Sequence, residues 1–178
     1  GKVSDSELSS ILHCAHQSGV RTIDTAIAYG NCESRLGASG ISGFDVVTKL
    51  PAIEKKQIVS TQWVLDEISE SRARLGCEQL HGVMVHRAAD LLGPAGAAIF
   101  EGMSEARDAG IAKRIGVSAY TTAELMEAAS RYPIDIAQMP LNILDRRLIE
   151  AGCLDELESQ GMEIHVRSVF LQGVLLMD

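Results

Sequence analysis

The sequence lacks the features that mark membrane proteins and nucleic-acid-binding proteins. No apolar run approaches the ~20 residues that a membrane-spanning helix requires, and no basic-then-apolar leader precedes the first expected helix. Lysine and arginine number only 16 against 24 acidic residues, which gives a net charge of −8 and argues against binding to a phosphate backbone. We therefore expect neither a membrane nor a nucleic acid as partner, and a cytoplasmic protein suits this balance.

Cysteine is also scarce, and its spacing excludes two further classes of protein. The four cysteines lie far apart, with no CxxC pair: Cys14, Cys32, Cys77 and Cys153. This spacing suits neither a compact disulfide framework nor a zinc site, so we expect reduced thiols and no bound metal. The 178 residues, 46% of them hydrophobic, are enough for one sizeable core. No linker-like change in composition divides them, so residues 1–178 are expected to form a single domain.

Helix signals recur at regular intervals along the chain. Ser4 and Glu7 have the spacing of a capping box, and Gly19 lies where a helix C-terminus is expected. Further helices are expected over residues 56–75, 95–109, 122–131 and 147–160. Pro133 and Gly161 would end the last two.

Six short runs rich in β-forming residues alternate with these helices: "RTIDTA", "FDVVTK", "HGVMVH", "RIGVSA", "DIAQM" and "EIHVRS". Several are apolar almost without alternation, as strands buried on both faces are. The alternation predicts a parallel α/β sheet. An open doubly wound sheet remains an alternative, although the first turn lacks the GxGxxG fingerprint; a (β/α)8 TIM barrel is the preferred interpretation.

The chain is short for a complete barrel. Such barrels usually need roughly 200 to 250 residues or more, and this chain supplies about six strand-helix units behind an initial helix. We therefore expect a partial barrel without its first strand and last helical layer. Two unpaired sheet edges would then remain, beside "RTIDTA" and "EIHVRS", and self-association through these edges is expected.

Polar side chains follow the predicted strands at the end where a barrel builds its active site. They are Asp24 with Tyr29 beyond it, Lys49, His86, Ser118, Gln138, and Arg167 with Ser168. A lone lysine after a strand is usually a turn back to solvent, and His165, inside a strand, is expected to be a satisfied core or rim residue. The hypothesis of an active site depends on the set, because burying an unpaired charge at the end of an apolar strand is costly.

At these strand ends the sequence resembles the aldo-keto reductase superfamily. The segment "IDTAIAYGNCESRLG" is similar to the Asp-Thr-Ala…Tyr-Gly…Glu…Leu-Gly signature of that family. "VVTKL", "VMVHR", "GIAKRIGVSAY", "DIAQMPLNILDR" and "VRSVFLQGVL" resemble its lysine, histidine, Gly-Val-Ser and glutamine strands and its cofactor loop, in the same order. The match covers nearly the whole chain.

The resemblance implies an oxidoreductase that reduces an aldehyde or ketone with NADPH, or with NADH. Tyr29 would be the general acid that gives its phenolic proton to the carbonyl oxygen. A free phenol has a pKa of ~10, and the ammonium of Lys49 would lower the pKa of Tyr29. Asp24 would hold Lys49 charged and oriented, and His86 would position the carbonyl oxygen.

The resemblance also implies a cofactor site. Asp24, Ser118 and Gln138 match positions near the nicotinamide, and the segment after the last strand would contact the ribose and diphosphate through Ser168, Phe170, Gln172 and Gly173. The chain departs from the family at Ala119, where many relatives carry Asn, and at Arg167, where many stack a Tyr on the nicotinamide. A guanidinium can also stack on a flat ring.

Two other functions fit parts of the pattern. A lyase could use Lys49 as a Schiff-base nucleophile, but this would give Tyr29 and Gln138 no role. A non-catalytic, cofactor-sensing subunit could use the same fold.

Overall fold

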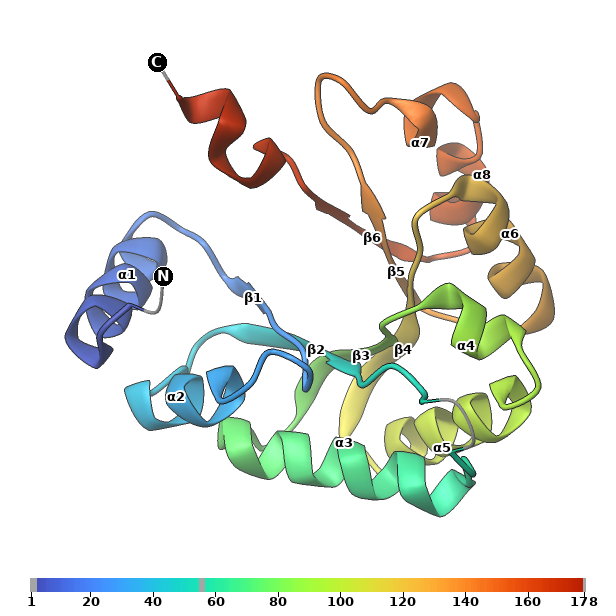
Figure 1. Cartoon of the computed structure of the whole chain (residues 1–178), viewed down its shortest axis with the longest axis horizontal. Coiled ribbons are helices and arrows are strands. Elements are labelled where there is room, and N and C mark those ends of the chain that lie inside the picture. The colour runs from blue at the N-terminus through green and yellow to red at the C-terminus, as the bar shows by residue number, and fades with distance from the viewer. Residues whose placement is uncertain (1–2, 55–56, 178) are drawn as a thin grey trace.

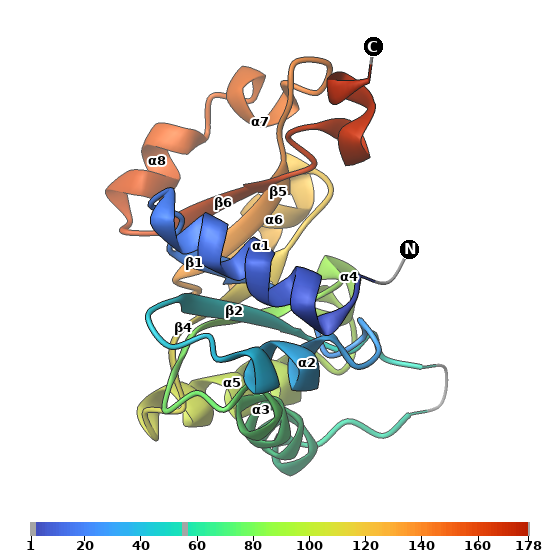
Figure 2. The same ribbon diagram turned by 90° about the vertical axis from the view of Figure 1, so that its left-hand side faces the viewer.

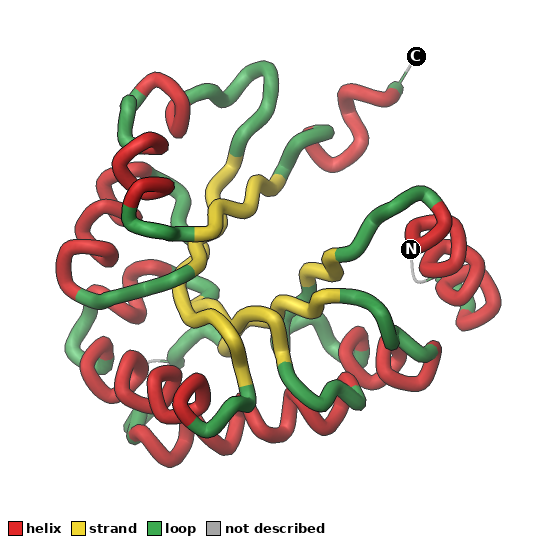
Figure 3. The backbone as a smooth tube through the Cα atoms, turned by 180° about the vertical axis from the view of Figure 1, so that it is seen from behind, coloured by secondary structure: helices red, strands yellow, loops and turns green. Residues whose placement is uncertain are grey.

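The computed structural model describes residues 3–54 and 57–177, and its centre is one parallel sheet. The six strands pair in chain order and are β1 (Thr22–Asp24), β2 (Asp45–Leu50), β3 (Leu80–Val85), β4 (Ala112–Ser118), β5 (Ile136–Pro140) and β6 (Glu163–Arg167). The sheet curls into an arc with helices along its outer side (Figures 1 and 3). This arrangement is part of a (β/α)8 barrel, and it confirms the predicted fold class.

Helices connect the strands and cover the convex face of the sheet. They are α1 (Asp5–Gln17), α2 (Cys32–Ser39), α3 (Thr61–Leu75), α4 (Ala88–Leu92), α5 (Gly96–Asp108), α6 (Thr122–Arg131), α7 (Arg147–Glu150) and α8 (Leu154–Ser159), with a 3-10 segment η1 at Leu171–Leu176. In Figure 2, α1 and α2 both lie at the β1 end of the molecule, and an ion pair between Arg35 and Asp5 joins them. None of the helices in the described part of the chain is long and apolar enough to cross a membrane.

The predicted helices are confirmed with three corrections. The helix expected over 56–75 begins only at Thr61, where the Ser60 side chain accepts a hydrogen bond from the backbone of Trp63; residue 56 itself lies outside the described residues. The helix expected over 147–160 is two short helices, because Gly152 between them adopts a φ of 67°. The helices α2 and α4 were not predicted.

The four central strands, β2 to β5, are mostly buried because helices pack on one face and the sheet curls over the other. In β2, every residue after Asp45 is buried, as expected for a strand covered on both sides. Val47, Met84 and Ile136 form a small apolar cluster of their own, separate from the main core under the helices. A Cβ on Gly116 would lie 1.6 Å from the carbonyl oxygen of Ile136, so the approach of β4 to β5 requires glycine there.

A buried carboxylate ties α2 to the layers around it. Glu33 is only 2% exposed, and its Oε1 accepts hydrogen bonds from the hydroxyls of Thr48 at 2.7 Å and Ser71 at 2.6 Å. Its Oε2 lies 2.8 Å from Nε of Arg74. The carboxylate thus links α2, β2 and α3, and its buried charge is fully engaged.

We expect Glu33→Ala to lower the free energy of unfolding by about 3 kcal/mol, because it leaves two buried hydroxyls without their acceptor and removes the nearer of the two carboxylates that pair with Arg74. Urea denaturation followed by circular dichroism measures this loss. Glu70→Ala is the matched control, since Glu70 is the exposed second partner of Arg74 at 3.5 Å and should cost less than ~1 kcal/mol. Equal losses in the two variants would contradict the structural role of Glu33.

The edges of the sheet, β1 and β6, have no strand partner on their outer sides in the described chain. Apolar side chains are exposed beside them, with Val20 47% and Val166 45% accessible. We expect concentration-dependent self-association in sedimentation velocity, and we expect Val166→Lys to reduce it by placing a charge on the edge. Ile58→Lys, at an exposed position away from both edges, should leave it unchanged. A monomer at all concentrations would contradict this prediction.

Candidate active site

An ion pair between a buried lysine and a partly exposed aspartate lies at the carboxyl ends of β1 and β2. Asp24 is the last residue of β1 and pairs in register with Val47, which places Lys49 one inward-facing position further along β2. Nζ of Lys49 lies 2.6 Å from Oδ1 of Asp24 and donates a second hydrogen bond to the Thr25 carbonyl oxygen at 3.0 Å. Lys49 is 1% exposed, whereas the Asp24 side chain is 39% exposed. The carboxylate is therefore the charged group of the pair that solvent or a ligand can reach.

Two polar side chains from the neighbouring strands extend this pair into a chain of hydrogen bonds. Ser118 and Gln138 face each other in the β4–β5 register, and both are 3% exposed. The Gln138 amide nitrogen donates to Oδ1 of Asp24 at 2.9 Å, and the Ser118 hydroxyl donates to Oε1 of Gln138 at 3.2 Å. Side chains from four strands, β1, β2, β4 and β5, thus form one connected polar group.

The aromatic rings of Tyr29 and His86 lie over this polar group. Tyr29 follows β1 in the turn before α2, and His86 follows directly after β3. The rings meet edge to face with centroids 5.8 Å apart, and Nζ of Lys49 lies 5.9 Å from the centre of the Tyr29 ring. Tyr29 is 50% exposed, so its side chain is accessible to a small molecule.

The expectation that Lys49 lowers the pKa of Tyr29 was wrong. Partial burial raises the pKa of Tyr29, and the carboxylate of Asp24 raises it further, while Arg167 opposes the shift. Burial is the larger cause, and the charge of Lys49 does not offset it because Lys49 is already engaged by Asp24 at 2.6 Å. Tyr29 consequently holds its proton at neutral pH.

Burial lowers the pKa values of the two basic groups, Lys49 and His86. Desolvation lowers the pKa of Lys49, and the ion pair with Asp24 opposes that shift. Desolvation also lowers the pKa of His86 below its ordinary value of 6.5, and the nearby charge of Lys49 lowers it further. His86 is therefore a neutral imidazole near neutral pH, with one N–H and one lone pair.

Arg167 lies on the far side of the site and contacts other residues of this chain. It is the last residue of β6, and its Nη2 donates to the Ala119 carbonyl oxygen at 3.3 Å. Its guanidinium lies 4.2 Å over the ring of Tyr120. One face of the guanidinium is thus stacked on an aromatic ring of this chain.

The segment after β6 holds the remaining predicted cofactor residues. Ser168 and Gln172 adopt φ values of 60° and 57°, which side-chain-bearing residues adopt rarely, and Gly173 has a φ of 94°. The Leu171 amide donates to the Ser168 carbonyl and the Gly173 amide to the Phe170 carbonyl, so these bonds run within the segment. Figure 1 shows this segment extending beyond the end of β6 rather than over β2 and β3. Strain of this kind is often kept at sites that contact a ligand.

The structure also shows a contact that sequence reasoning missed. The Thr25 carbonyl oxygen is the second acceptor for Lys49, a backbone role that no side-chain pattern signals. The Thr25 hydroxyl, by contrast, is buried without a hydrogen-bond partner in the described structure.

The fold and this arrangement define a partial parallel α/β barrel with a polar site at the carboxyl ends of its strands. The Aldo/keto reductase family model matches residues 1–177, and the chain belongs to this family of oxidoreductases. An aldo-keto reductase from Mycolicibacterium paratuberculosis is 40% identical over 126 residues, which cover 67% of this chain and 42% of that protein. One from Mycobacterium avium is similar to the same extent. The chain therefore matches less than half of the length of these relatives.

Solved structures show the same fold at lower sequence identity. An aldo-keto reductase from Bacillus halodurans, in its holo form, superposes with a TM-score of 0.82 at 19% identity, over 98% of this chain and 61% of that one. A glycerol dehydrogenase from Gluconobacter oxydans gives a TM-score of 0.76 at 22% identity, over 98% of this chain and 57% of that one. Both chains are longer than the part matched here.

Proposed function

We propose that this chain carries the catalytic centre of an NAD(P)H-dependent reductase of aldehydes or ketones. The observation that carries the proposal is the ion pair between buried Lys49 and partly exposed Asp24, which lies beneath the rings of Tyr29 and His86. In this assignment Tyr29 donates a proton, Lys49 and Asp24 fix the charge around it, and His86 orients the substrate carbonyl. The family of the chain supports this activity.

Tyr29 has the properties of a proton donor. The phenol is protonated at neutral pH, and its half exposure lets a carbonyl oxygen approach the hydroxyl. A general acid must hold its proton until charge develops on the substrate oxygen. His86, neutral and in edge contact with the Tyr29 ring, can donate its N–H to the same oxygen and fix its position.

The buried polar groups fit a nicotinamide dinucleotide, which supplies a hydride when bound. The Gln138 amide uses one N–H on Asp24, which leaves its second N–H, and the Ser118 hydroxyl keeps acceptor capacity. Both lie where a carboxamide group could share these bonds. Ser168, Phe170, Gln172 and Gly173 would then contact the ribose and diphosphate, and Arg167 would contribute the unstacked face of its guanidinium.

Oxidation of NADPH in the presence of a reactive aromatic aldehyde tests the proposed function. The assay requires a protein in which the barrel is complete, and NADH in parallel measures the cofactor preference. We expect aldehyde-dependent loss of the reduced cofactor. Cofactor binding without turnover of any carbonyl compound would instead favour a cofactor-sensing role.

The Schiff-base alternative is weakened by the position of Lys49. An attacking amine must reach the substrate, yet Lys49 is 1% exposed and its Nζ donates to Asp24 and Thr25. Its lowered pKa is the single property that would suit a nucleophile. Borohydride treatment with a carbonyl substrate should therefore leave Lys49 unlabelled, and a trapped adduct would overturn the reductase assignment.

A further inference from the structure

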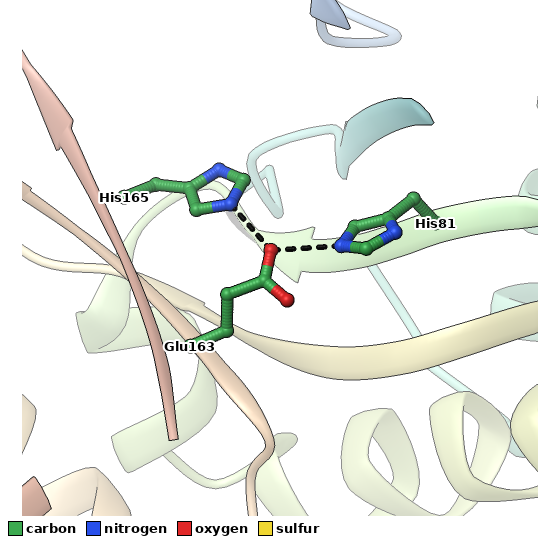
Figure 4. A group of neighbouring side chains, drawn as sticks. All are labelled: His81, Glu163 and His165. Carbon is green, nitrogen blue, oxygen red and sulfur yellow. Dashed lines mark hydrogen bonds and ion pairs between the residues drawn. The ribbon is translucent and has the colours of Figure 1, made fainter. Parts of the chain in front are cut away.

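A second cluster of ionisable side chains lies toward the amino ends of the strands, below the Asp24–Lys49 pair. Glu163 begins β6, His165 lies two residues further along it, and His81 is the second residue of β3. Oε1 of Glu163 lies 2.7 Å from Nε2 of His81 and 2.6 Å from Nε2 of His165. Figure 4 shows the carboxylate between the two imidazole rings, which are nearly parallel. Because β4 and β5 separate β3 from β6, the contact spans the concave side of the curled sheet.

Two further charged residues, Arg114 and Asp45, contact this cluster. Nε of Arg114 lies 2.7 Å from Oε2 of Glu163, so it occupies the carboxylate oxygen that does not face the histidines. Oδ1 of Asp45 lies 3.5 Å from Nδ1 of His81, the ring nitrogen that does not face Glu163. A carboxylate behind a histidine, and a hydrogen bond to the far oxygen of a glutamate, are typical supports of metal ligands.

The hydrogen bonds of His81 are incomplete as the cluster stands. A neutral imidazole has one N–H, and Glu163 and Asp45 are both acceptors on opposite sides of the ring. With the N–H directed at Glu163, Nδ1 presents a lone pair toward Asp45, and this atom is buried without a hydrogen-bond partner. A cation between the two Nε2 atoms and Oε1 would use the lone pairs, and Nδ1–H of His81 could then donate to Asp45.

We propose that His81, Glu163 and His165 form a binding site for a divalent transition-metal ion, with Zn²⁺ as the best fit. The three ligand atoms lie within 4.8 Å of one another, and zinc bound at ~2.0–2.2 Å requires only small adjustments of the side chains. Imidazole nitrogens favour zinc over Mg²⁺ or Ca²⁺. Three protein ligands leave the fourth tetrahedral position open to water.

The side chains of the three proposed ligands are accessible. Those of His165, His81 and Glu163 are 17%, 18% and 27% exposed, so an ion can enter without unfolding the sheet. The site uses none of the residues assigned to proton transfer.

Zinc titration of the 178-residue chain against a chromophoric chelator tests the proposal, and Co²⁺ serves as an optical substitute. We expect one bound equivalent, lost in His81→Gln and in His165→Gln. Asp45→Asn keeps all three ligands and should weaken binding by roughly 10- to 100-fold. His13→Gln and Cys14→Ser, at exposed positions on α1, are matched controls that should bind as the unmodified chain does.

X-ray absorption at the zinc edge of the unmodified chain provides a test that needs no variant to fold. We expect two imidazole nitrogens and an oxygen at ~2.0–2.2 Å and no sulfur at ~2.3 Å. A sulfur ligand, binding that survives His81→Gln in a variant with normal circular dichroism, or the absence of a bound equivalent in the unmodified chain would each overturn the proposal. Binding that disappears in His13→Gln would instead identify an adventitious site on the surface of α1.

Discussion

Tyr29→Phe should lower kcat for carbonyl reduction by about 10²- to 10⁴-fold in a protein with a complete barrel, because it removes the proposed proton donor and nothing else. The substitution keeps the ring that contacts His86 at 5.8 Å. Dinucleotide affinity should change little, because the hydroxyl is assigned to the substrate oxygen and not to the cofactor. Stopped-flow turnover with an aromatic aldehyde measures the first effect, and a cofactor fluorescence titration measures the second.

Tyr132→Phe is the matched control for this prediction. Tyr132 lies at the end of α6 in the outer layer, where its ring stacks on Phe100 with centroids 4.9 Å apart. Removing its hydroxyl should leave kcat unchanged. If Tyr29→Phe retained near wild-type kcat, Tyr29 would have no part in proton transfer, and a water molecule or His86 would have to supply the proton.

The strands and the polar strand ends could be predicted because both are local in the sequence. "FDVVTK" is apolar enough for a strand buried on both faces, and a lysine at its end is conspicuous for that reason. Parallel strands present their carboxyl ends at one edge, so Asp24 and Lys49 could be placed together before any coordinates. The structure adds the 2.6 Å distance between their charged atoms.

The pKa of Tyr29 could not be predicted in the same way. The direction of the pKa shift depends on how much of the ring is buried. It also depends on which charge of the Asp24–Lys49 pair lies nearer to the phenol. Sequence order gives the members of the pair but not the 39% exposure of the carboxylate against 1% for the lysine. Burial of the ring is the larger cause of the raised pKa, and the exposed carboxylate of Asp24 adds to it.

The His81–Glu163–His165 cluster was also beyond sequence analysis, for a geometric reason. His81 and Glu163 are 82 residues apart, and two strands lie between theirs in the sheet. Only the curvature of the sheet brings them within hydrogen-bonding distance. His165 was expected to be a satisfied core or rim residue, and its contact with Glu163 at 2.6 Å accounts for one ring nitrogen.

Lys49→Met is the second substitution with a large expected effect, and it acts through charge. Asp24 would lose its counter-ion, and the uncompensated carboxylate would raise the pKa of Tyr29 further and make the phenol a weaker acid. We expect kcat to fall by about 10²- to 10⁴-fold, as for loss of the general acid itself. The affinity for dinucleotide should fall less, because Ser118 and Gln138 remain.

The same substitution should move the pKa of His86 upward. Burial is the largest cause that lowers that pKa and the charge of Lys49 is the next, so removing the ammonium removes one of the lowering causes. The sign follows directly: with less repulsion, the ring takes up a proton at a higher pH, nearer its ordinary value of 6.5. An NMR titration of the His86 ring measures this shift in the absence of substrate. Lys113→Met, at an exposed position on β4, should change neither kcat nor the titration. An unshifted His86 in folded Lys49→Met would mean that the ammonium does not act on the site, and the roles assigned to the Asp24–Lys49 pair would then have to be withdrawn.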